Sequence, residues 1–255
     1  MGNRNTVFTR QVSLGSLVTL IGLLAITSLC WLYLFDMAAD MAAMSMGDMM
    51  SFRHWTPGYF AAMLLMWSIM MVAMMTPSAA PMILLYRQVA RKNHLAGAFL
   101  GTALFAGGYL LIWGLFSLVA TALQWLLEES ALLSPKMLSQ NQMFSGTVLV
   151  AAGIYQFSSL KQACLRRCRG PLLFITRYWR SGLWGAFEMG VRHGAYCVGC
   201  CVALMALLFV GGVMDLSVIA AIAFVVLLEK LIPGGEWLAR AVGALAIALG
   251  VVLIV

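Results

Sequence analysis

Residues 183–211 read LWGAFEMGVRHGAYCVGCCVALMALLFVG, an apolar run long enough to cross a bilayer as one helix. At about 100° per residue, one histidine and three cysteines of this run fall within roughly 80° of one helix face. Thiolate sulfur together with an imidazole nitrogen suits Cu(I) first and Zn(II) second. The run therefore predicts a metal site inside a membrane span, with His193, Cys197, Cys200 and Cys201 as ligands.

This stripe also has plainer explanations. A buried cysteine on its own is usually a small hydrophobic residue, and the same thiols could instead carry redox chemistry. The joint arrangement favours a metal, because the cluster lies near the middle of its span, where polar groups are candidates for function. Gly190 and Gly194 lie on the same side of the helix, and they predict the close approach of a neighbouring helix.

The composition is that of a membrane protein. Of the 255 residues, 63 % are hydrophobic and 10 % are charged, and the mean hydropathy is +0.94. A soluble domain has about a quarter of its residues charged, so we expect an all-α polytopic membrane helix bundle surrounded by the lipid bilayer. The net charge of +7 is better explained by basic cytoplasmic loops than by binding of nucleic acid.

Apolar runs predict about seven transmembrane helices in a single integral membrane domain, residues 1–255. Basic residues precede the first run and follow the second, fourth and sixth, with Lys161 and Lys230 among them. The positive-inside rule then predicts a multi-pass protein with a cytoplasmic N-terminus and a C-terminus outside. The predicted spans are 13–35, 58–85, 96–126, 143–162, 183–211, 215–232 and 237–255.

The segment between the first two spans, residues 36–57, is predicted to be a methionine-rich outer loop. Thioether sulfur binds Cu(I) without losing a proton, even in an oxidising compartment. The alternative is an apolar interfacial helix in which methionine fills gaps, although three aspartates in the segment fit that poorly. The candidate copper ligands are Met37, Met41, Met44, Met46, Met49 and Met50.

A second group of methionines lies in the second span. At helical spacing they form a stripe about 80° wide, which predicts either a path that guides metal or an adaptable packing face. Pro77 and Pro81 remove backbone hydrogen bonds and predict a kink. The stripe consists of Met63, Met66, Met70 and Met74, widened by Met71 and Met75.

Cys164 and Cys168 fall at the start of a predicted basic cytoplasmic loop, residues 163–182. They are four residues apart and would face one ion if the preceding helix continued that far. Basic neighbours are expected to stabilise the thiolate form. The alternative is that membrane-surface arginines surround two incidental cysteines. The basic neighbours are Lys161, Arg166, Arg167 and Arg169.

Few other charges lie near the spans. Glu188 and Arg192 are four residues apart and are predicted to pair. Glu229 and Lys230 are predicted to mark the cytoplasmic end of the sixth span. The sequence has no phosphate-cradling glycine-rich loop before Lys-Ser or Lys-Thr, so we expect no ATP-driven step. We expect a binding protein rather than an enzyme, with thiol redox activity as the alternative.

Three motifs resemble those of a known family. They occupy residues 66–82, 155–169 and 190–201, and the dipeptide Glu229-Lys230 follows them. Together they resemble an uncharacterised bacterial family described as predicted metal-binding integral membrane proteins, a domain of unknown function. The resemblance covers about residues 58–250 and implies a metal-binding protein of the bacterial inner (cytoplasmic) membrane.

These observations predict a Cu(I)-handling membrane protein. The outer methionines capture the ion, the second-span stripe passes it inward, and the Cys/His stripe holds it. Cys164 and Cys168 then receive it, or the protein delivers it to a membrane cuproenzyme or another copper chaperone. The alternatives are a membrane thiol-disulfide oxidoreductase and a structural accessory subunit of a larger membrane enzyme.

Overall fold

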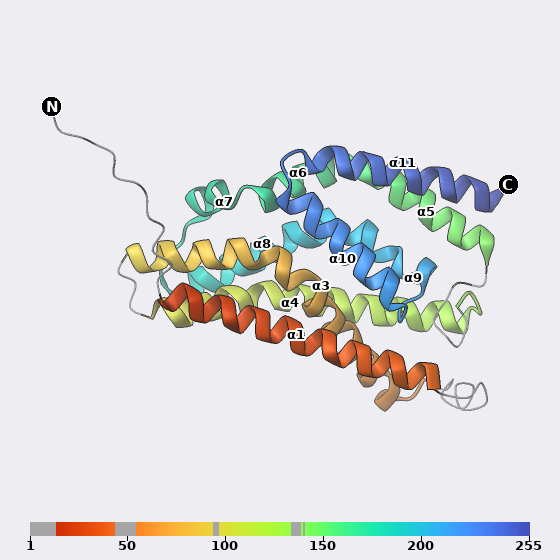
Figure 1. Cartoon of the computed structure of the whole chain (residues 1–255), viewed down its shortest axis with the longest axis horizontal. Helices are drawn as coiled ribbons and strands as arrows, with labels where there is room; N and C mark the ends of the chain where they lie inside the picture. The colour runs from red at the N-terminus through yellow and green to blue at the C-terminus, as the bar shows by residue number, and fades with distance from the viewer. Residues whose placement is uncertain (1–13, 44–54, 94–96, 134–138, 140) are drawn as a thin grey trace.

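A computed structural model describes residues 14–43, 55–93, 97–133, 139 and 141–255. These residues form α-helices joined by short connections, and the β-structure among them is one isolated bridge between Leu133 and Ser139. The longer helices run along the long axis of the molecule (Figure 1). The predicted all-α helix bundle is therefore confirmed.

The helices follow one another along the chain with few residues between them. Their bounds are α1 Leu14–Ala43, α3 Pro57–Lys92, α4 Ala98–Glu129, α5 Gln142–Gln156, α6 Ser159–Arg169, α7 Pro171–Tyr178, α8 Gly182–Ala206, α9 Leu208–Gly211, α10 Leu216–Leu231 and α11 Gly235–Ile254.

Five helical segments of the described chain are long and apolar enough to cross a membrane: α1, α3, α4, α8 with α9, and α11. A sixth arises if α5 and α6, which are bent by 62° at their junction, form one broken span. The predicted sixth span, residues 215–232, corresponds to α10, which has 16 residues and is shorter than the usual 20 or so.

Polar side chains define where several helices begin. In each case a side-chain oxygen accepts a hydrogen bond from a backbone N–H of the first turn, which would otherwise have no partner. Pro57 follows one such cap at the first helical position, where its missing N–H costs nothing. The caps are Thr56 for α3, Asn141 for α5, Ser158 for α6 and Asp215 for α10.

Helices α4 and α8 make the closest contact in the bundle. Gly190 of α8 lies against the backbone carbonyl of Phe105 in α4, and Gly108 of α4 lies against the carbonyl of Phe187 in α8. A Cβ atom at either glycine would collide with the opposite backbone. This small-residue contact is the usual way to bring helices together in lipid, and it confirms the close approach predicted from Gly190.

A second helix pair, α5 with α11, is built in the same way. Each helix presents small residues to the backbone of the other, so that the two axes lie close along most of the length of α5. These contacts hold α11 against α5. The residues are Gly146 and Gly153 in α5, and Gly243 and Gly250 in α11.

The methionine face of α3 points into the core. All six methionines predicted as a stripe are buried, with at most 5 % of each exposed. The helix continues through Pro77 and Pro81, and it changes direction about midway along its length (Figure 1). The buried set is Met63, Met66, Met70, Met71, Met74 and Met75.

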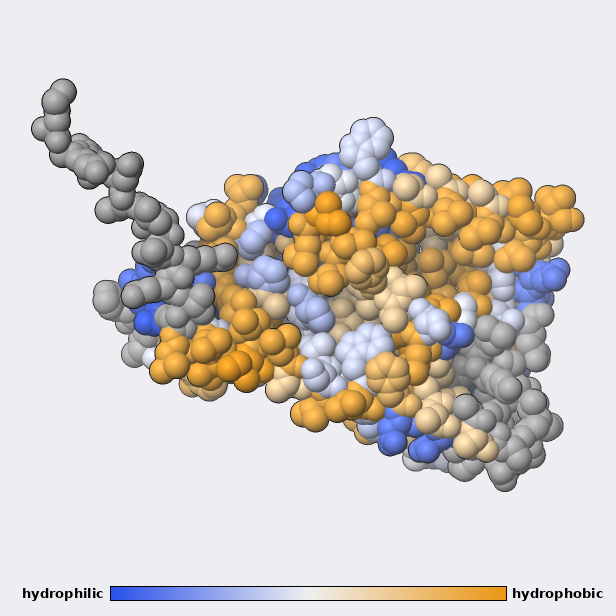
Figure 2. All heavy atoms as spheres, in the orientation of Figure 1, coloured by the Kyte–Doolittle hydropathy of each residue, from blue (hydrophilic) through white to orange (hydrophobic). Residues whose placement is uncertain are grey.

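The outer surface is apolar over most of its area. Figure 2 shows hydrophobic side chains across the visible face, with hydrophilic residues near the two ends and along the edge formed by α6 and the start of α11. Helix α1 buries only 6 % of its apolar window, against 44 % for α3 and for α8. Because so much apolar surface is exposed, the bundle is compatible with a membrane and α1 lies at its periphery.

Two segments predicted as loops contain helix. Helix α1 continues to Ala43, beyond the predicted end of the first span at residue 35, so Met37 and Met41 lie on a helix and pack at the edge of the core. The predicted loop 163–182 holds the end of α6 and all of α7. Alanine-rich and basic sequences favour helix strongly enough to extend both. Met44, Met46, Met49 and Met50 lie outside the described residues.

Substitution of Gly108 by alanine is expected to destabilise the folded protein by about 1–3 kcal/mol, because the new methyl group must push two backbones apart. Thermal unfolding of the detergent-solubilised protein measures the effect. The matched control is Gly107→Ala, one residue away on α4, where a Cβ meets nothing within 4 Å. Equal stability of the two variants would contradict the close α4–α8 contact.

Candidate metal centre

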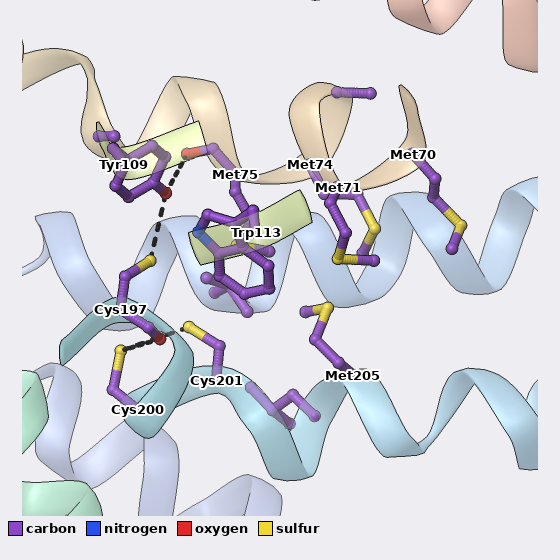
Figure 3. Packing of buried hydrophobic residues seen from close by; sticks show 14 of the residues in the cluster. Met70, Met71, Met74, Met75, Tyr109, Trp113, Cys197, Cys200, Cys201 and Met205 are labelled. Carbon is purple, nitrogen blue, oxygen red and sulfur yellow. Dashed lines mark hydrogen bonds between the residues drawn. The ribbon is translucent and has the colours of Figure 1, made fainter. Parts of the chain in front are cut away.

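Four cysteine thiols gather where α6 meets α8. Cys197, Cys200 and Cys201 each expose 1 % of their surface, and Figure 3 shows their side chains on neighbouring positions of α8. The Sγ atoms of Cys200 and Cys201 are 3.3 Å apart, and Cys200 Sγ lies 3.9 Å from Cys168 Sγ of α6. Two predicted sites, one on each helix, therefore form one cluster, which we call the thiol cluster.

Cys164 lies at the edge of the thiol cluster. Helix α6 continues to Arg169, which is the condition for Cys164 and Cys168 to share a face. Both face α8: a Cβ built at Gly199, between Cys197 and Cys200, would stand 2.8 Å from the Cys164 sulfur. The two cysteines of α6 are thus part of the same centre rather than a separate site further along the chain.

A lysine from α10 contacts the cluster. The Nζ atom of Lys230 lies 2.9 Å from Cys197 Sγ and 3.0 Å from the hydroxyl oxygen of Ser78 in α3. The neighbouring Glu229 accepts a hydrogen bond from Lys161 of α6 at 2.7 Å, and this ion pair is almost completely buried. Three charged side chains therefore lie inside the bundle beside the thiols.

This arrangement corrects the predicted positions of two lysines. The sequence places Lys161 and Lys230 among the basic residues of cytoplasmic loops, but they expose 0 % and 8 % of their surface. Lys161, which is one of the residues predicted to stabilise the thiolates of Cys164 and Cys168, pairs with Glu229 instead. In the described part of the chain, the cation that hydrogen-bonds a cysteine sulfur is Lys230 of α10.

Tyr109 of α4 connects the thiol cluster to α3. Its hydroxyl lies 3.2 Å from Cys197 Sγ and donates to the backbone carbonyl of Met75, also at 3.2 Å. Beyond Met75, Figure 3 shows Met205 of α8 pointing toward Met71 and Met74 of α3. The buried thioether sulfurs therefore lie next to the thiol cluster.

A chain of polar side chains lies at the far end of the methionine stripe. Gln124 of α4 donates to the sulfur of Met63 at 3.8 Å and to Glu128 at 2.8 Å, and it accepts from the indole N–H of Trp67 at 2.7 Å. Trp55 also donates to Glu128, at 3.0 Å. This chain lies at the end of the bundle where α1 ends and α3 begins (Figure 1).

His193 is buried in an aromatic pocket one turn before Cys197. Its ring stacks on Phe105 and Tyr109, with centroids 6.1 and 5.5 Å away, and meets the edge of Phe174 at 5.4 Å. Among the residues that the structure describes, its Nδ1 atom has no hydrogen-bond partner, which is unusual for a buried polar atom. The ring shares the helix face of the thiols.

The cluster is not arranged as a finished coordination sphere. Within the described ranges, no three His, Cys, Asp or Glu side chains stand in the geometry of a metal site. The thiols are free and lie within hydrogen-bond distance of one another, so rotation about their Cα–Cβ bonds is the movement needed to share an ion. The donor set, thiols beside thioethers, suits a soft monovalent metal.

A family model described as PpoB2, a copper chaperone, matches residues 64–253. The chain belongs to the PpoB2 copper chaperone family. This membership confirms the resemblance to a metal-binding family and shows that the protein has a copper-related function. The match includes the thiol cluster, Lys230 and the methionines from Met66 onward, whereas Met37, Met41 and Met63 precede it. No curated protein and no solved structure matches this chain.

The polar side chains that surround the sulfurs are not predicted by the helical pattern of the sequence. Lys230 left a signal, because a charged pair, Glu229-Lys230, ends an otherwise apolar run and belongs to the motifs that carry the resemblance. Ser78 and Tyr109 left none, since a serine or tyrosine in an apolar helix is common. The predicted pair of Glu188 and Arg192 is confirmed at 3.0 Å.

The buried Lys161–Glu229 pair gives a stability prediction. Lys161→Met leaves Glu229 without its partner and is expected to cost about 3–5 kcal/mol, whereas adding Glu229→Gln should restore most of that loss. Thermal unfolding measures both variants. Arg192→Ala, at a pair that is 40 % and 27 % exposed, serves as the control and should cost under about 1 kcal/mol. A double variant no more stable than Lys161→Met would refute this account.

Proposed function

We propose that this protein is a membrane copper chaperone that binds Cu(I) through the thiol cluster, Cys168, Cys197, Cys200 and Cys201. The observation that supports it is the convergence of four free thiols from two helices, with sulfur separations of 3.3 and 3.9 Å. Thiolate sulfur is the ligand that Cu(I) prefers, and the family description names copper. The role is one of binding and transfer, without an enzymatic step.

The buried methionines supply the path to this centre. The stripe on α3 runs through the core from Met63 to Met75, whose carbonyl shares the Tyr109 hydroxyl with Cys197. Uncharged thioethers hold Cu(I) less tightly than thiolates do, because a thiolate adds charge attraction to the soft interaction. The free energy of a Cu(I) ion that enters among the methionines therefore falls when it moves to the cysteines.

The methionines that precede the path complete the proposal. Met37 and Met41 lie on α1 at the end of the bundle that holds Met63. With Met44, Met46, Met49 and Met50 they would collect Cu(I) outside the inner membrane of a bacterium, with the N-terminus in the cytoplasm and the C-terminus outside. His193 and Cys164 border the thiol cluster and would take part in release to a membrane cuproenzyme or a second chaperone.

The double variant Cys197→Ser, Cys200→Ser is expected to lose bound Cu(I), because it removes two central thiolates while changing little volume. Copper is measured by metal analysis of the purified protein after loading under reducing conditions. Cys30→Ser is the matched control, because Cys30 is a free, half-buried thiol on α1 rather than on α6 or α8. If the double variant keeps the copper content of the wild type, the proposed site is wrong.

Loss of thioethers should slow loading without reducing capacity. Met74→Leu with Met205→Leu keeps the apolar volume and removes two sulfurs that point toward the same space (Figure 3). The rate of Cu(I) transfer from a chromophoric chelator is expected to fall several-fold, at unchanged final stoichiometry. Met143→Leu, at a methionine 57 % exposed, is the control. An unchanged rate would remove the methionine path from the proposal.

One observation also favours a membrane thiol-disulfide oxidoreductase. Cys168 and Cys200 come from different helices, and their sulfurs are 3.9 Å apart, so a small approach would allow a disulfide. Counting free thiols with and without an oxidant, in the absence of metal, separates the two functions. Reversible loss of one thiol pair together with no bound copper would select the oxidoreductase.

A further inference from the structure

The buried charges beside the thiol cluster do not cancel among themselves. Lys161 and Glu229 form a neutral pair at 2.7 Å, which leaves the ammonium of Lys230 as one extra positive charge. No ion pair found in the described part of the chain includes Lys230. A charge removed from water is costly unless an opposite charge lies close to it.

Among the groups around Lys230, a cysteine sulfur is the one that can carry the balancing negative charge. Ser78 of α3 offers a hydroxyl at 3.0 Å, and Cys197 of α8 offers a thiol sulfur at 2.9 Å. The hydroxyl of Tyr109 in α4 lies 3.2 Å from the same sulfur. Because the nearby carboxylate, Glu229, is already engaged by Lys161, negative charge on the thiol cluster is what balances the ammonium.

We propose that Lys230 sets the charge selectivity of the thiol cluster: its fixed positive charge matches a monovalent metal ion held by two thiolates. This inference rests on the proposed function. Lys230 is a positioning and specificity residue, not a metal ligand, since an ammonium has no lone pair to donate.

The net charge of each metal complex, counted together with the Lys230 ammonium, shows why Cu(I) is preferred over Zn(II). Two thiolates and Cu(I) carry a net charge of −1, which the ammonium neutralises. Two thiolates and Zn(II) are neutral, so the ammonium remains unbalanced in the interior. Four thiolates with Zn(II), the usual tetrahedral complex, carry −2 and leave −1 after the ammonium is counted. Within a lipid-embedded bundle, the neutral arrangement is favoured.

A divalent arrangement would also be neutral if three thiolates and one neutral ligand held Zn(II). His193 is the histidine on the thiol face of α8, and its ring is stacked against Phe105 and Tyr109 and meets the edge of Phe174. Binding of Zn(II) through this imidazole would therefore have to compete with the aromatic stacking.

The test is equilibrium competition between Cu(I) and Zn(II) on the purified full-length protein. In Lys230→Met, and independently in Lys230→Gln, the ratio of Cu(I) to Zn(II) affinity is expected to fall at least about tenfold, because the counter-charge is lost. Lys230→Arg keeps the charge and should stay within about threefold of the wild type. Glutamine keeps a polar group near Ser78, whereas methionine does not. If one of these two neutral variants does not fold, the other still tests the inference.

The control is the double variant Lys161→Met, Glu229→Gln, which removes two buried charges but leaves their sum unchanged. Its affinity ratio should equal that of the wild type. The inference is overturned if both neutral variants keep the wild-type ratio, if the control shifts the ratio as far as they do, or if equimolar Zn(II) displaces Cu(I) from the wild type. Failure of the proposed function gives a different result, because the Cys197→Ser, Cys200→Ser variant would then keep its bound copper.

Discussion

The close contact between α4 and α8 is the constraint on which the centre of this protein depends. Glycine at positions 108 and 190 allows the two backbones to meet, and lipid offers no hydrophobic driving force that would hold them together by other means. Because the helices are so close, the Tyr109 hydroxyl reaches Cys197 and the rings of Phe105 and Tyr109 cover His193. A wider separation of α4 and α8 would remove the Tyr109 hydroxyl from Cys197.

A second constraint follows from burying charge within an apolar bundle. Lys161, Glu229 and Lys230 come from two helices that each contact α8, and each charge must find its partner inside the protein. The partner of Lys230 is a thiol that belongs to the proposed copper site. If the proposed copper site is correct, the contact between Lys230 and Cys197 couples the charge balance of the core to the chemistry of the metal.

The sulfur ligands are ordered along the molecule. Thioethers occupy the core face of α3, and thiols occupy the junction of α6 and α8, with the Tyr109 hydroxyl between the two groups. Membership of a copper chaperone family gives this order a meaning, because neutral thioethers suit capture and rapid exchange whereas thiolates suit retention. Both groups of sulfur lie in the buried core, where a Cu(I) ion bound as proposed would be protected from competing ligands.

The helix class and the buried methionine face could be predicted because both are periodic in the chain. A helix repeats every 3.6 residues, so the spacing of Met66, Met70 and Met74 alone predicts that they share one helix face. All three are buried. The number of spans was harder to predict, because α5 and α6 bend by 62° within one apolar run. Helix length beyond the apolar run was missed at α1, where alanines continue the helix to residue 43.

The sequence by itself determined the membrane class, the sulfur-rich faces and the close approach at Gly190, since each depends on composition or on local spacing. The tertiary structure alone decided that Cys168 joins Cys200, that Lys161 pairs with Glu229, and that Lys230 contacts Cys197. Those partners are between 32 and 68 residues apart in the chain. Helical periodicity says which face a side chain occupies, but only the packing of one helix on another says what that face meets.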